Sequence, residues 1–350
     1  MGLTKHWRTE EGARVAGSRA LDSSKLQAPC IVRIPDGGFR LFYTAVGPAK
    51  PYPLCQGYVL SAVSDDGLDF EVEPGIRLAP HPDLEHLSRR IIAPTVKQYA
   101  DGSWRMYFEA RGPATEPTVI RSAVSTDMLH WEHEDGIRLQ GFDGLGGPRY
   151  LPLPEGGGRL YCFGSEYDSN GLKGSRLSQS VVSAVTADGL VFEMEPGFRL
   201  HDNQADYDDL GITAAEVILP RTKGDDWSMV FSAWQDAPPG TEVPLHPSHD
   251  TSDSADESSM DFAAASIAAD IAGFRSRIFL AYSPDGLSWT RAGCIIDGVG
   301  YESSEINAVH AEDMSVTEIG GGRYRMYYAA CGNDGNWRIA SAVTEGVPTP

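Results

Sequence analysis

The feature that most constrains this chain is a hairpin motif that recurs five times along it. Each copy is a tight turn followed by a strand of alternating aromatic or apolar residues. The copies span Gly37–Tyr43, Asp101–Phe108, Gly157–Phe163, Asp225–Phe231 and Gly321–Tyr328. A turn that leads directly into an alternating strand is typical of a β-hairpin. The repetition indicates several copies of one supersecondary unit, each packed against the next.

A second motif follows each hairpin, and in it a strand runs into a turn with Asp and Gly. Its copies begin at Ser61, Ser122, Ser183, Ala281 and Ser341, and the last is cut short. The stretch W-R-T-E-E-G-A-R-V (Trp7–Val15) repeats the segment that follows the other copies, so the N-terminal strand is expected to complete the fifth unit. The sequence therefore predicts an all-β, five-bladed β-propeller closed by this strand, because closure removes an open sheet edge.

The predicted organisation is a single domain over residues 1–350. The blades are expected at roughly residues 21–80, 90–141, 145–201, 211–297, and 304–346 together with 5–16. An insertion at 235–276 interrupts the fourth blade, and its part Asp256–Gly273 has the pattern of a short helix. Long insertions in compact domains often form lids or interfaces. We expect a lid or a contact in a homo-oligomer here.

Composition narrows the classes of partner. The formal net charge is −20, which disfavours nucleic acid and anionic membrane surfaces. Residues 1–19 have no apolar signal-like run, and no stretch is long enough to span a bilayer. The five cysteines form no C-x-x-C pair and are expected to be buried thiols. These features predict a soluble cytoplasmic protein.

The D-G-L-x-W/F turns, the G-x-Y-R-M-Y-Y hairpin and the A-P-x-V strand starts together resemble a known group. This group is the five-bladed propeller superfamily of glycoside hydrolases, with families 43, 32 and 117. The resemblance covers nearly the whole chain. It implies an active site in a funnel at the propeller axis, with acidic residues at the start of the innermost strands.

Counting back from the hairpin aromatics locates those positions at Ala28, Ala93, Gly147 and Glu216. The resemblance to family 43 implies that Glu216 is the general acid, and its apolar neighbours favour a protonated carboxyl group. The same resemblance places acidic residues of family 43 where this chain has Ala28 and Gly147. The usual carboxylate pair is therefore absent, and another residue must supply the base or nucleophile.

The fifth blade offers further catalytic candidates. One alignment of its first strand places His310 opposite Glu216, whereas counting back from Tyr327 places Asp313 there. Both registers bring His310, Glu312 and Asp313 near the axis, and a histidine can act as acid or base near neutral pH. Asp22, just before the first inner strand, is a weaker catalytic candidate.

Other residues at the predicted funnel are candidates for binding substrate. Arginines can hold an anionic group, aromatic rings can stack on a sugar, and carboxylates can bind its hydroxyl groups. The alternative for each charged residue is an ordinary ion pair or a solvated loop. The candidates are Arg149, Arg90, Glu109, Arg111, Trp234, Tyr167 and Asp208.

The predicted function is a glycoside hydrolase-like enzyme acting on a small glycoside or oligosaccharide, with Glu216 as general acid and His310 or Asp313 assisting. One alternative is a lyase, cyclase or metal-assisted hydrolase on the same scaffold, and another is a non-catalytic sugar-binding propeller. No cofactor is expected, since the histidines lack the close spacing of a strong metal motif. A divalent metal in the funnel, held by His310 and Glu216, is the alternative.

Overall fold

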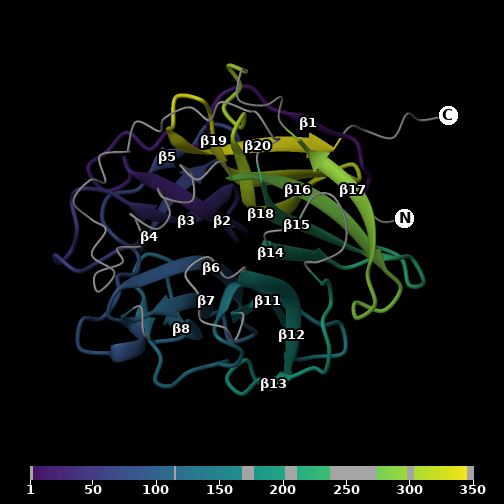
Figure 1. Cartoon of the computed structure of the whole chain (residues 1–350), viewed down its shortest axis with the longest axis horizontal. Coiled ribbons are helices and arrows are strands. Elements are labelled where there is room, and N and C mark those ends of the chain that lie inside the picture. Colours follow the sequence, from purple (N-terminus) through teal and green to yellow (C-terminus); the bar gives the residue numbers. More distant parts are fainter. Residues whose placement is uncertain are drawn as a thin grey trace.

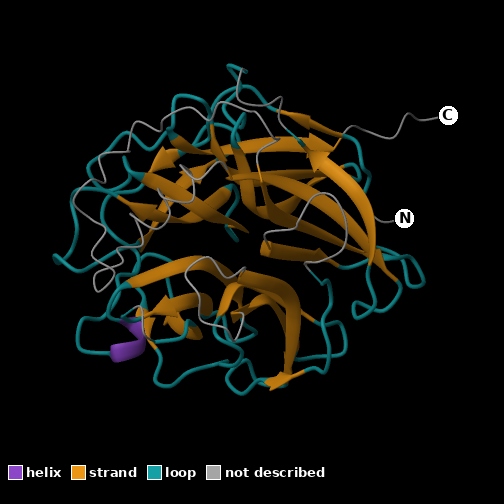
Figure 2. Ribbon diagram, viewed as in Figure 1, coloured by secondary structure: helices purple, strands orange, loops and turns teal. Residues whose placement is uncertain are grey.

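The structure, a computed structural model, describes residues 3–113, 116–167, 177–201, 211–236, 274–297 and 303–344. Within these ranges the regular secondary structure is almost entirely strand, and the helical element is a short 3-10 turn, η1 (Glu85–Leu87) (Figure 2). The all-β class agrees with the sequence prediction. The helix predicted over Asp256–Gly273 lies outside the described residues. No helix in the described ranges is long and apolar enough to cross a membrane.

Three antiparallel sheets follow one another along the chain, each with four strands in sequence order. The first contains β2 (Lys25–Arg33), β3 (Phe39–Val46), β4 (Tyr58–Ser64) and β5 (Glu71–Val72). The second contains β6 (Arg90–Gln98), β7 (Trp104–Arg111), β8 (Val119–Ser125) and β9 (Glu132–His133). The third contains β10 (Leu145–Pro152), β11 (Gly158–Tyr167), β12 (Leu177–Thr186) and β13 (Glu193–Met194). Each sheet thus contains one copy of the repeated hairpin.

The remaining strands form one eight-stranded sheet made of two four-stranded groups. One group is β14 (Gly211–Ile218), β15 (Trp227–Asp236), β16 (Phe274–Ser283) and β17 (Thr290–Ile296). The other is β18 (His310–Gly320), β19 (Arg323–Cys331), β20 (Trp337–Thr344) and β1 (Trp7–Thr9). Only one parallel pair, Ser276 with His310, joins the two groups. The N-terminal strand β1 pairs with β20, as the repeat predicted.

The first strands of the five groups lie next to one another. We call β2, β6, β10, β14 and β18 the inner strands. In the order of the chain each contacts the following one, and β18 contacts β2. In Figure 1 the labels of β2, β6, β14 and β18 lie toward the middle of the molecule, whereas β5, β13 and β17 lie at its periphery. This arrangement brings the beginnings of the inner strands together.

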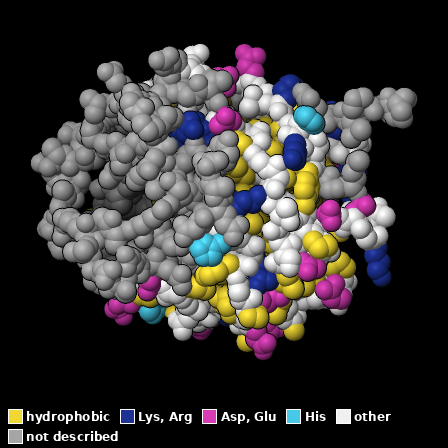
Figure 3. Space-filling view, turned by 45° about the vertical axis from the view of Figure 1, so that its right-hand side comes forward, with side chains coloured by type: hydrophobic (Ala, Val, Ile, Leu, Met, Phe, Trp, Pro, Cys, Tyr) yellow, Lys and Arg dark blue, Asp and Glu magenta, His cyan; other side chains and the backbone are white. Residues whose placement is uncertain are grey.

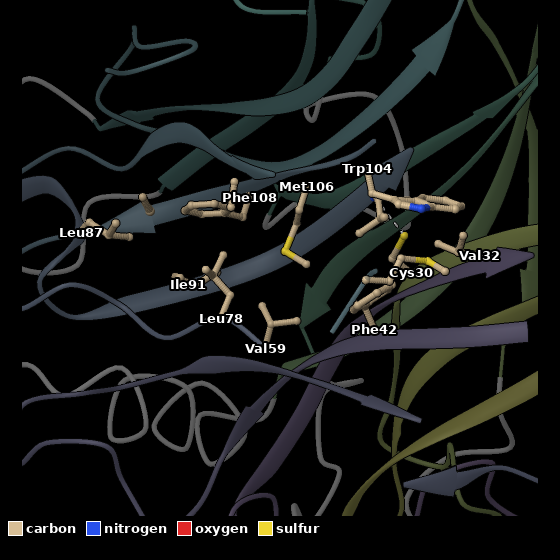
Figure 4. Close-up of a cluster of buried hydrophobic side chains, with 14 of the residues drawn as sticks. Cys30, Val32, Phe42, Val59, Leu78, Leu87, Ile91, Trp104, Met106 and Phe108 are labelled. Atoms are coloured by element: carbon tan, nitrogen blue, oxygen red, sulfur yellow. Dashed lines mark hydrogen bonds between the residues drawn. The ribbon is translucent and has the colours of Figure 1, made fainter. Parts of the chain in front are cut away.

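Hydrophobic side chains fill the spaces between neighbouring sheets. Between the first and second sheets, Phe42, Val59, Ile91, Met106 and Phe108 form part of one buried cluster (Figure 4). Alternation along each strand directs such residues to the two faces of its sheet. Burying a side chain of this size stabilises the fold by roughly 1.5–3 kcal/mol. The sheets are therefore held mainly by face-to-face packing.

The repeated Asp and Gly turns also join neighbouring sheets. Asp66 accepts hydrogen bonds from the backbone N–H groups of Leu68 and Asp69 at 2.8 and 3.1 Å. The next residue, Gly67, has φ of +76°, and its carbonyl accepts a 2.8 Å hydrogen bond from the hydroxyl group of Tyr327 on β19. A Cβ at Gly67 would lie 2.6 Å from the hydroxyl oxygen of Tyr327. Glycine is needed here for both the backbone angle and the close approach.

Four of the five strand groups also share a polar cluster. Arg40 pairs with Glu73 at 2.8 Å, and Ser61 donates a 2.6 Å hydrogen bond to the same carboxylate. In the last group the N-terminal segment supplies the acid, because Glu10 pairs with Arg325 at 2.8 Å and accepts a hydrogen bond from Ser341. The equivalent clusters are Arg105–Glu134–Ser122 and Arg159–Glu195–Ser183.

The N-terminal segment also reaches the neighbouring group. The backbone N–H of Leu3 donates to Ser228 Oγ at 2.8 Å, and the Leu3 carbonyl accepts from the hydroxyl group of Tyr282 at 2.6 Å. Leu3 is buried there. The segment therefore contacts both groups of the eight-stranded sheet.

The acidic charge of the chain is not gathered into one patch on the face drawn in Figure 3. Acidic, basic and hydrophobic side chains of described residues are interspersed on it.

Replacing Tyr327 by Phe should destabilise the protein by about 1 kcal/mol, because it removes one buried hydrogen bond between β19 and the first sheet. Phe42 stands at the equivalent position of the first hairpin, where it packs edge-on against Trp131, so the fold accommodates a Phe there. Denaturant unfolding of Tyr327→Phe against the wild type measures the change. An unchanged free energy of unfolding would show that this bond does not hold the sheets together.

Candidate active site

Four inner strands carry the same backbone irregularity near their start. Ala28, Ala93, Gly147 and Asp313 have φ of 49°, 53°, 57° and 53°. At each of them the pairing with the next strand shifts by one residue, as in a β-bulge. Positive φ is uncommon for residues other than glycine. These four positions are therefore structurally equivalent.

The equivalence resolves the register of β18. Asp313, and not His310, occupies the position of Ala28, Ala93 and Gly147, as the count from Tyr327 predicted. His310 lies three residues earlier and pairs with Cys331. Its counterparts at the starts of β2 and β6 are Lys25 and Arg90, which pair with Val46 and Arg111. All three side chains are buried.

Glu216 does not occupy the position that the count from Val230 assigned to it. Glu216 itself pairs with Val230, as Arg149 pairs with Tyr161 in the third sheet. It therefore lies two residues beyond the position of Gly147. The reason is that the chain between Glu216 and its partner Val230 is two residues longer than the chain between Arg149 and Tyr161. The sequence count assumed turns of equal length.

Arg149 lies where the five inner strands meet. Its guanidinium group donates to the carbonyl oxygens of Met314 on β18 at 3.2 Å and of Pro29 on β2 at 3.4 Å. It also donates to Pro148 on its own strand at 3.1 Å and to Pro94 on β6 at 3.5 Å. The fifth inner strand contributes Glu216, whose carboxylate lies 3.3 Å from Arg149 Nε. One buried side chain thus contacts all five inner strands.

This geometry changes the expected roles of Arg149 and Glu216. Arg149 is 4% exposed and its donors point to backbone carbonyls, so it is held within the protein rather than directed at a ligand. Glu216 is not a lone carboxylate in an apolar strand, because it balances the charge of Arg149. An acid held in an ion pair with a buried arginine is committed to the packing of the inner strands.

Asp313 and Glu312 form the most unusual pair of acidic groups in the described part of the chain. Burial, followed by the charge of Glu312, raises the pKa of Asp313 to about 8. The charges of Arg149 and Lys25 act in the opposite direction, and that of Glu109 adds to the rise. The backbone N–H of Asp313 donates to Ser232 Oγ at 3.0 Å, and Trp234 Nε1 donates to Glu312 at 2.9 Å. Asp313 is therefore a protonated carboxyl group held among charged neighbours at neutral pH.

Glu109 is a third buried acidic residue, and its charge acts on Asp313. It lies on β7, where Arg90 Nη2 donates to its Oε1 at 2.9 Å and the backbone N–H of Gly147 donates to its Oε2 at 3.3 Å. A Cβ at the neighbouring Gly146 would come within 2.3 Å of the same oxygen. The predicted binding residues Arg90 and Glu109 therefore contact each other in a buried ion pair.

His310 is held by its surroundings at the start of β18. Its Nδ1 lies 3.1 Å from Ser276 Oγ, and its ring stacks on Trp337 with centroids 5.1 Å apart. Lys25 Nζ lies 3.9 Å from the centroid of the same indole, a cation–π contact. Since His310 is 2% exposed, its contacts are with the protein.

The remaining predicted site residues lie apart from this cluster or outside the description. Asp22 is buried, and Arg19 Nε and Nη2 both donate to its Oδ2, at 3.0 and 2.6 Å. Arg111 ends β7 opposite Arg90. Tyr167 ends β11, and its side chain is not described. Asp208 lies outside the described residues.

Sequence reasoning missed Lys25, Trp337 and Ser232. Lys25 and Ser232 are buried polar residues on strands and contribute to the surroundings of Asp313. Lys25, Arg90 and His310 each lie three residues before a left-handed position, at Ala28, Ala93 and Asp313. This shared offset is the sequence signal that could have identified Lys25. Trp337 begins β20, and its position lies between the two repeated sequence motifs, so neither motif marks it.

The sequence left a divalent metal ion, held by His310 and Glu216, as an alternative. In the described ranges, no group of three or more His, Cys, Asp or Glu residues is arranged to hold a metal ion. His310 and Glu216 as metal ligands stay a prediction.

Comparison with known proteins identifies the fold. No family model and no curated protein matches the chain. A solved structure described as a glycoside hydrolase superimposes with a TM-score of 0.67 at 14% identity, covering 99% of this chain and 94% of that one. A thermostable family-43 glycoside hydrolase gives 0.60 at 16% identity, with 98% of each chain covered.

A third match has a different activity. An N-acetylgalactosamine deacetylase from F. plautii gives a TM-score of 0.61 at 13% identity, covering 97% of this chain and 95% of that one. At such identities the likeness shows the fold alone. The chain shares the fold of these solved structures, and the resemblance seen in the sequence is confirmed at that level.

Replacing Arg149 by Met should cost about 3–5 kcal/mol of stability, because it leaves Glu216 and several converging carbonyls without their cation. The double variant Arg149→Met/Glu216→Gln should lose less than the sum of the two single changes, since the pair is in direct contact. Denaturant unfolding of the three variants measures this coupling. Additive losses would contradict the central role of the pair.

The raised pKa of Asp313 predicts a pH-dependent stability. The folded chain keeps the Asp313 proton up to about pH 8, whereas the unfolded chain loses it near the ordinary value of 3.8. The unfolded state then binds fewer protons, so the free energy of unfolding falls as the pH rises from about 4 to about 8. Asp313→Asn should remove this dependence, and asparagine tolerates the left-handed backbone. A wild-type minus variant difference that stays constant across this window would show that Asp313 titrates normally.

Proposed function

We propose that this chain is a five-bladed, single-domain propeller whose ring is closed by the N-terminal strand, and that it hydrolyses a small glycoside or oligosaccharide at the start of the inner strands. The observation that carries the proposal is the buried carboxyl group of Asp313 at the left-handed position of β18, next to Glu312. Burial and then the charge of Glu312 raise its pKa to about 8, and the charge of Glu109 acts in the same direction. A carboxylic acid and a carboxylate are what glycoside hydrolysis requires.

Asp313 is the general acid in this proposal. A group with a pKa of about 8 keeps its proton at neutral pH and can transfer it to the leaving glycosidic oxygen as the bond to the anomeric carbon breaks. Its left-handed backbone is a strained conformation for a residue with a side chain, as is common where geometry serves function. Glu216 is not the acid in this proposal, because it forms an ion pair with Arg149.

Glu109 is the partner carboxylate in this proposal. Arg90 and the Gly147 N–H both donate to it, which fixes its orientation. It either takes a proton from the water that attacks the anomeric carbon or attacks that carbon itself, and water then releases the sugar. Glu312 sustains the proton on Asp313 by its charge. His310 contributes by fixing the start of β18, where Glu312 and Asp313 lie.

A different enzyme on the same fold is the second candidate. The observation in its favour is that a deacetylase shares the fold as closely as the family-43 hydrolase does. Such an enzyme would release an acyl group and leave the glycosidic bond intact. Product analysis separates the two functions. Oligomer formation through residues 235–276 stays a prediction, since nearly all of that insertion lies outside the described residues.

Activity should be screened with aryl glycosides and short oligosaccharides. Asp313→Asn should lower kcat by about 10²- to 10⁴-fold, the usual contribution of a general acid, and wild-type activity should fall above about pH 8. Glu318→Gln, at the far end of the same strand, is the matched control and should retain activity. Full activity of Asp313→Asn on every cleaved substrate would reject the assignment, and release of acetate from acetylated sugars without cleavage would favour the deacetylase.

A further inference from the structure

A strained aromatic residue precedes the third inner strand. Phe142 has φ of +54° and is 40% exposed. A bulky residue in the left-handed region is a clear outlier. Such strain persists only where the surrounding structure imposes it, and it gathers at functional sites. The exposure of this ring is therefore not explained by core packing.

The neighbouring backbone fixes the ring in place. The N–H of Asp143 donates to the Ser165 carbonyl, and the N–H of Ser165 donates to the Gly144 carbonyl, both at 2.9 Å. The ring lies over Gly164 on β11, where a Cβ would come within 2.9 Å of it. The absence of a side chain at Gly164 thus provides the space for the Phe142 ring.

The repeat itself does not require an aromatic residue here. Five residues before the left-handed positions Ala28, Ala93 and Asp313, the chain has Ser23, Ser88 and Ala308. Only small side chains occupy those three strand entries. Phe142, at the same distance before Gly147, is a departure specific to the third sheet.

A second exposed ring extends this surface. Phe198, which follows β13, is 37% exposed, and its centroid lies 6.1 Å from that of Phe142 with the planes tilted by 37°. His201 meets the edge of Phe198 at 5.1 Å. We call Phe142 and Phe198 the aromatic pair. Two half-exposed rings in contact present a continuous apolar surface.

The aromatic pair is close to the proposed reaction centre along the chain. Phe142 lies four residues before Gly146, whose backbone approaches Glu109 so closely that a Cβ would lie 2.3 Å from its Oε2. Four residues span at most about 14 Å. A substrate unit on the rings can therefore belong to the same oligosaccharide as a unit at Glu109 and Asp313.

We propose that the aromatic pair is a sugar-binding subsite, which stacks the apolar face of a sugar unit beyond the unit that reacts. Flat, rigid rings offer a large apolar surface that suits the C–H face of a pyranose or furanose. The inference rests on the proposed function and deepens it. It identifies the substrate as an oligosaccharide rather than a simple monosaccharide glycoside.

The decisive variant is Phe142→Gly, because glycine adopts this backbone angle without strain. Binding is measured by calorimetry with mannose, xylose and arabinose oligosaccharides of two to five units, and activity is measured separately with aryl monosaccharides. We expect Phe142→Gly to weaken binding of the longer ligands by roughly 3- to 10-fold and to leave aryl monosaccharide kinetics and thermal stability unchanged. Phe142→Trp, which keeps an aromatic ring at this position, should bind the longer ligands more tightly than Phe142→Gly does.

Val191→Ala is the matched control, since Val191 is 68% exposed in the same sheet and lies outside the pair. The inference is overturned if Phe142→Gly binds every oligosaccharide like the wild type, or if the wild type binds none of them. It is also overturned if Phe142→Gly loses thermal stability and binds normally, which would make the ring a packing element. Activity on aryl glycosides without an effect of Phe142 would reject the subsite and leave the proposed function standing.

Discussion

The arrangement of the inner strands depends on one guanidinium group. Bulges near the strand starts turn backbone carbonyls toward the place where these strands meet, and Arg149 donates to carbonyls from four of them. Carbonyl dipoles that converge in a buried place need a positive donor, and that charge needs a counterion. Glu216 from the fifth inner strand provides it. Because Arg149 holds the carbonyl of Met314, it also fixes the backbone beside Asp313.

The candidate site exists because equivalent positions of the inner strands carry different residues. The same left-handed bulge carries Ala28, Ala93 and Gly147 in three strands and Asp313 in the fourth. The three small residues add no ionisable group at their positions, whereas burial and then the charge of Glu312 raise the pKa of the one carboxyl group, Asp313. The proposed partner, Glu109, comes from β7 and forms an ion pair with Arg90. A repeated fold thus gains chemical asymmetry through single residues.

Much of the fold could be read from the sequence, because turns and aromatic residues recur at fixed spacing. The pairing of β1 with β20 followed from comparing Trp7–Val15 with the other copies. The site was harder to predict. The role of Glu216 depended on the length of one turn, which no repeat specified. The pairing of Arg90 with Glu109 and the contacts of Arg149 depend on three-dimensional proximity between strands that lie far apart in the chain.

The position of β1 has a consequence for how the chain acquires its structure. The first three sheets are built from consecutive residues, so each can form as soon as its own segment has been synthesised. The segment containing Trp7 and Glu10 is made before all of them, yet its partners Ser341 and Arg325 come last. Such a contact between distant residues is costly in loop entropy and forms late. Until then the edge of β20 is open to pairing with another chain, so newly made molecules are most exposed to misassembly just before folding is complete.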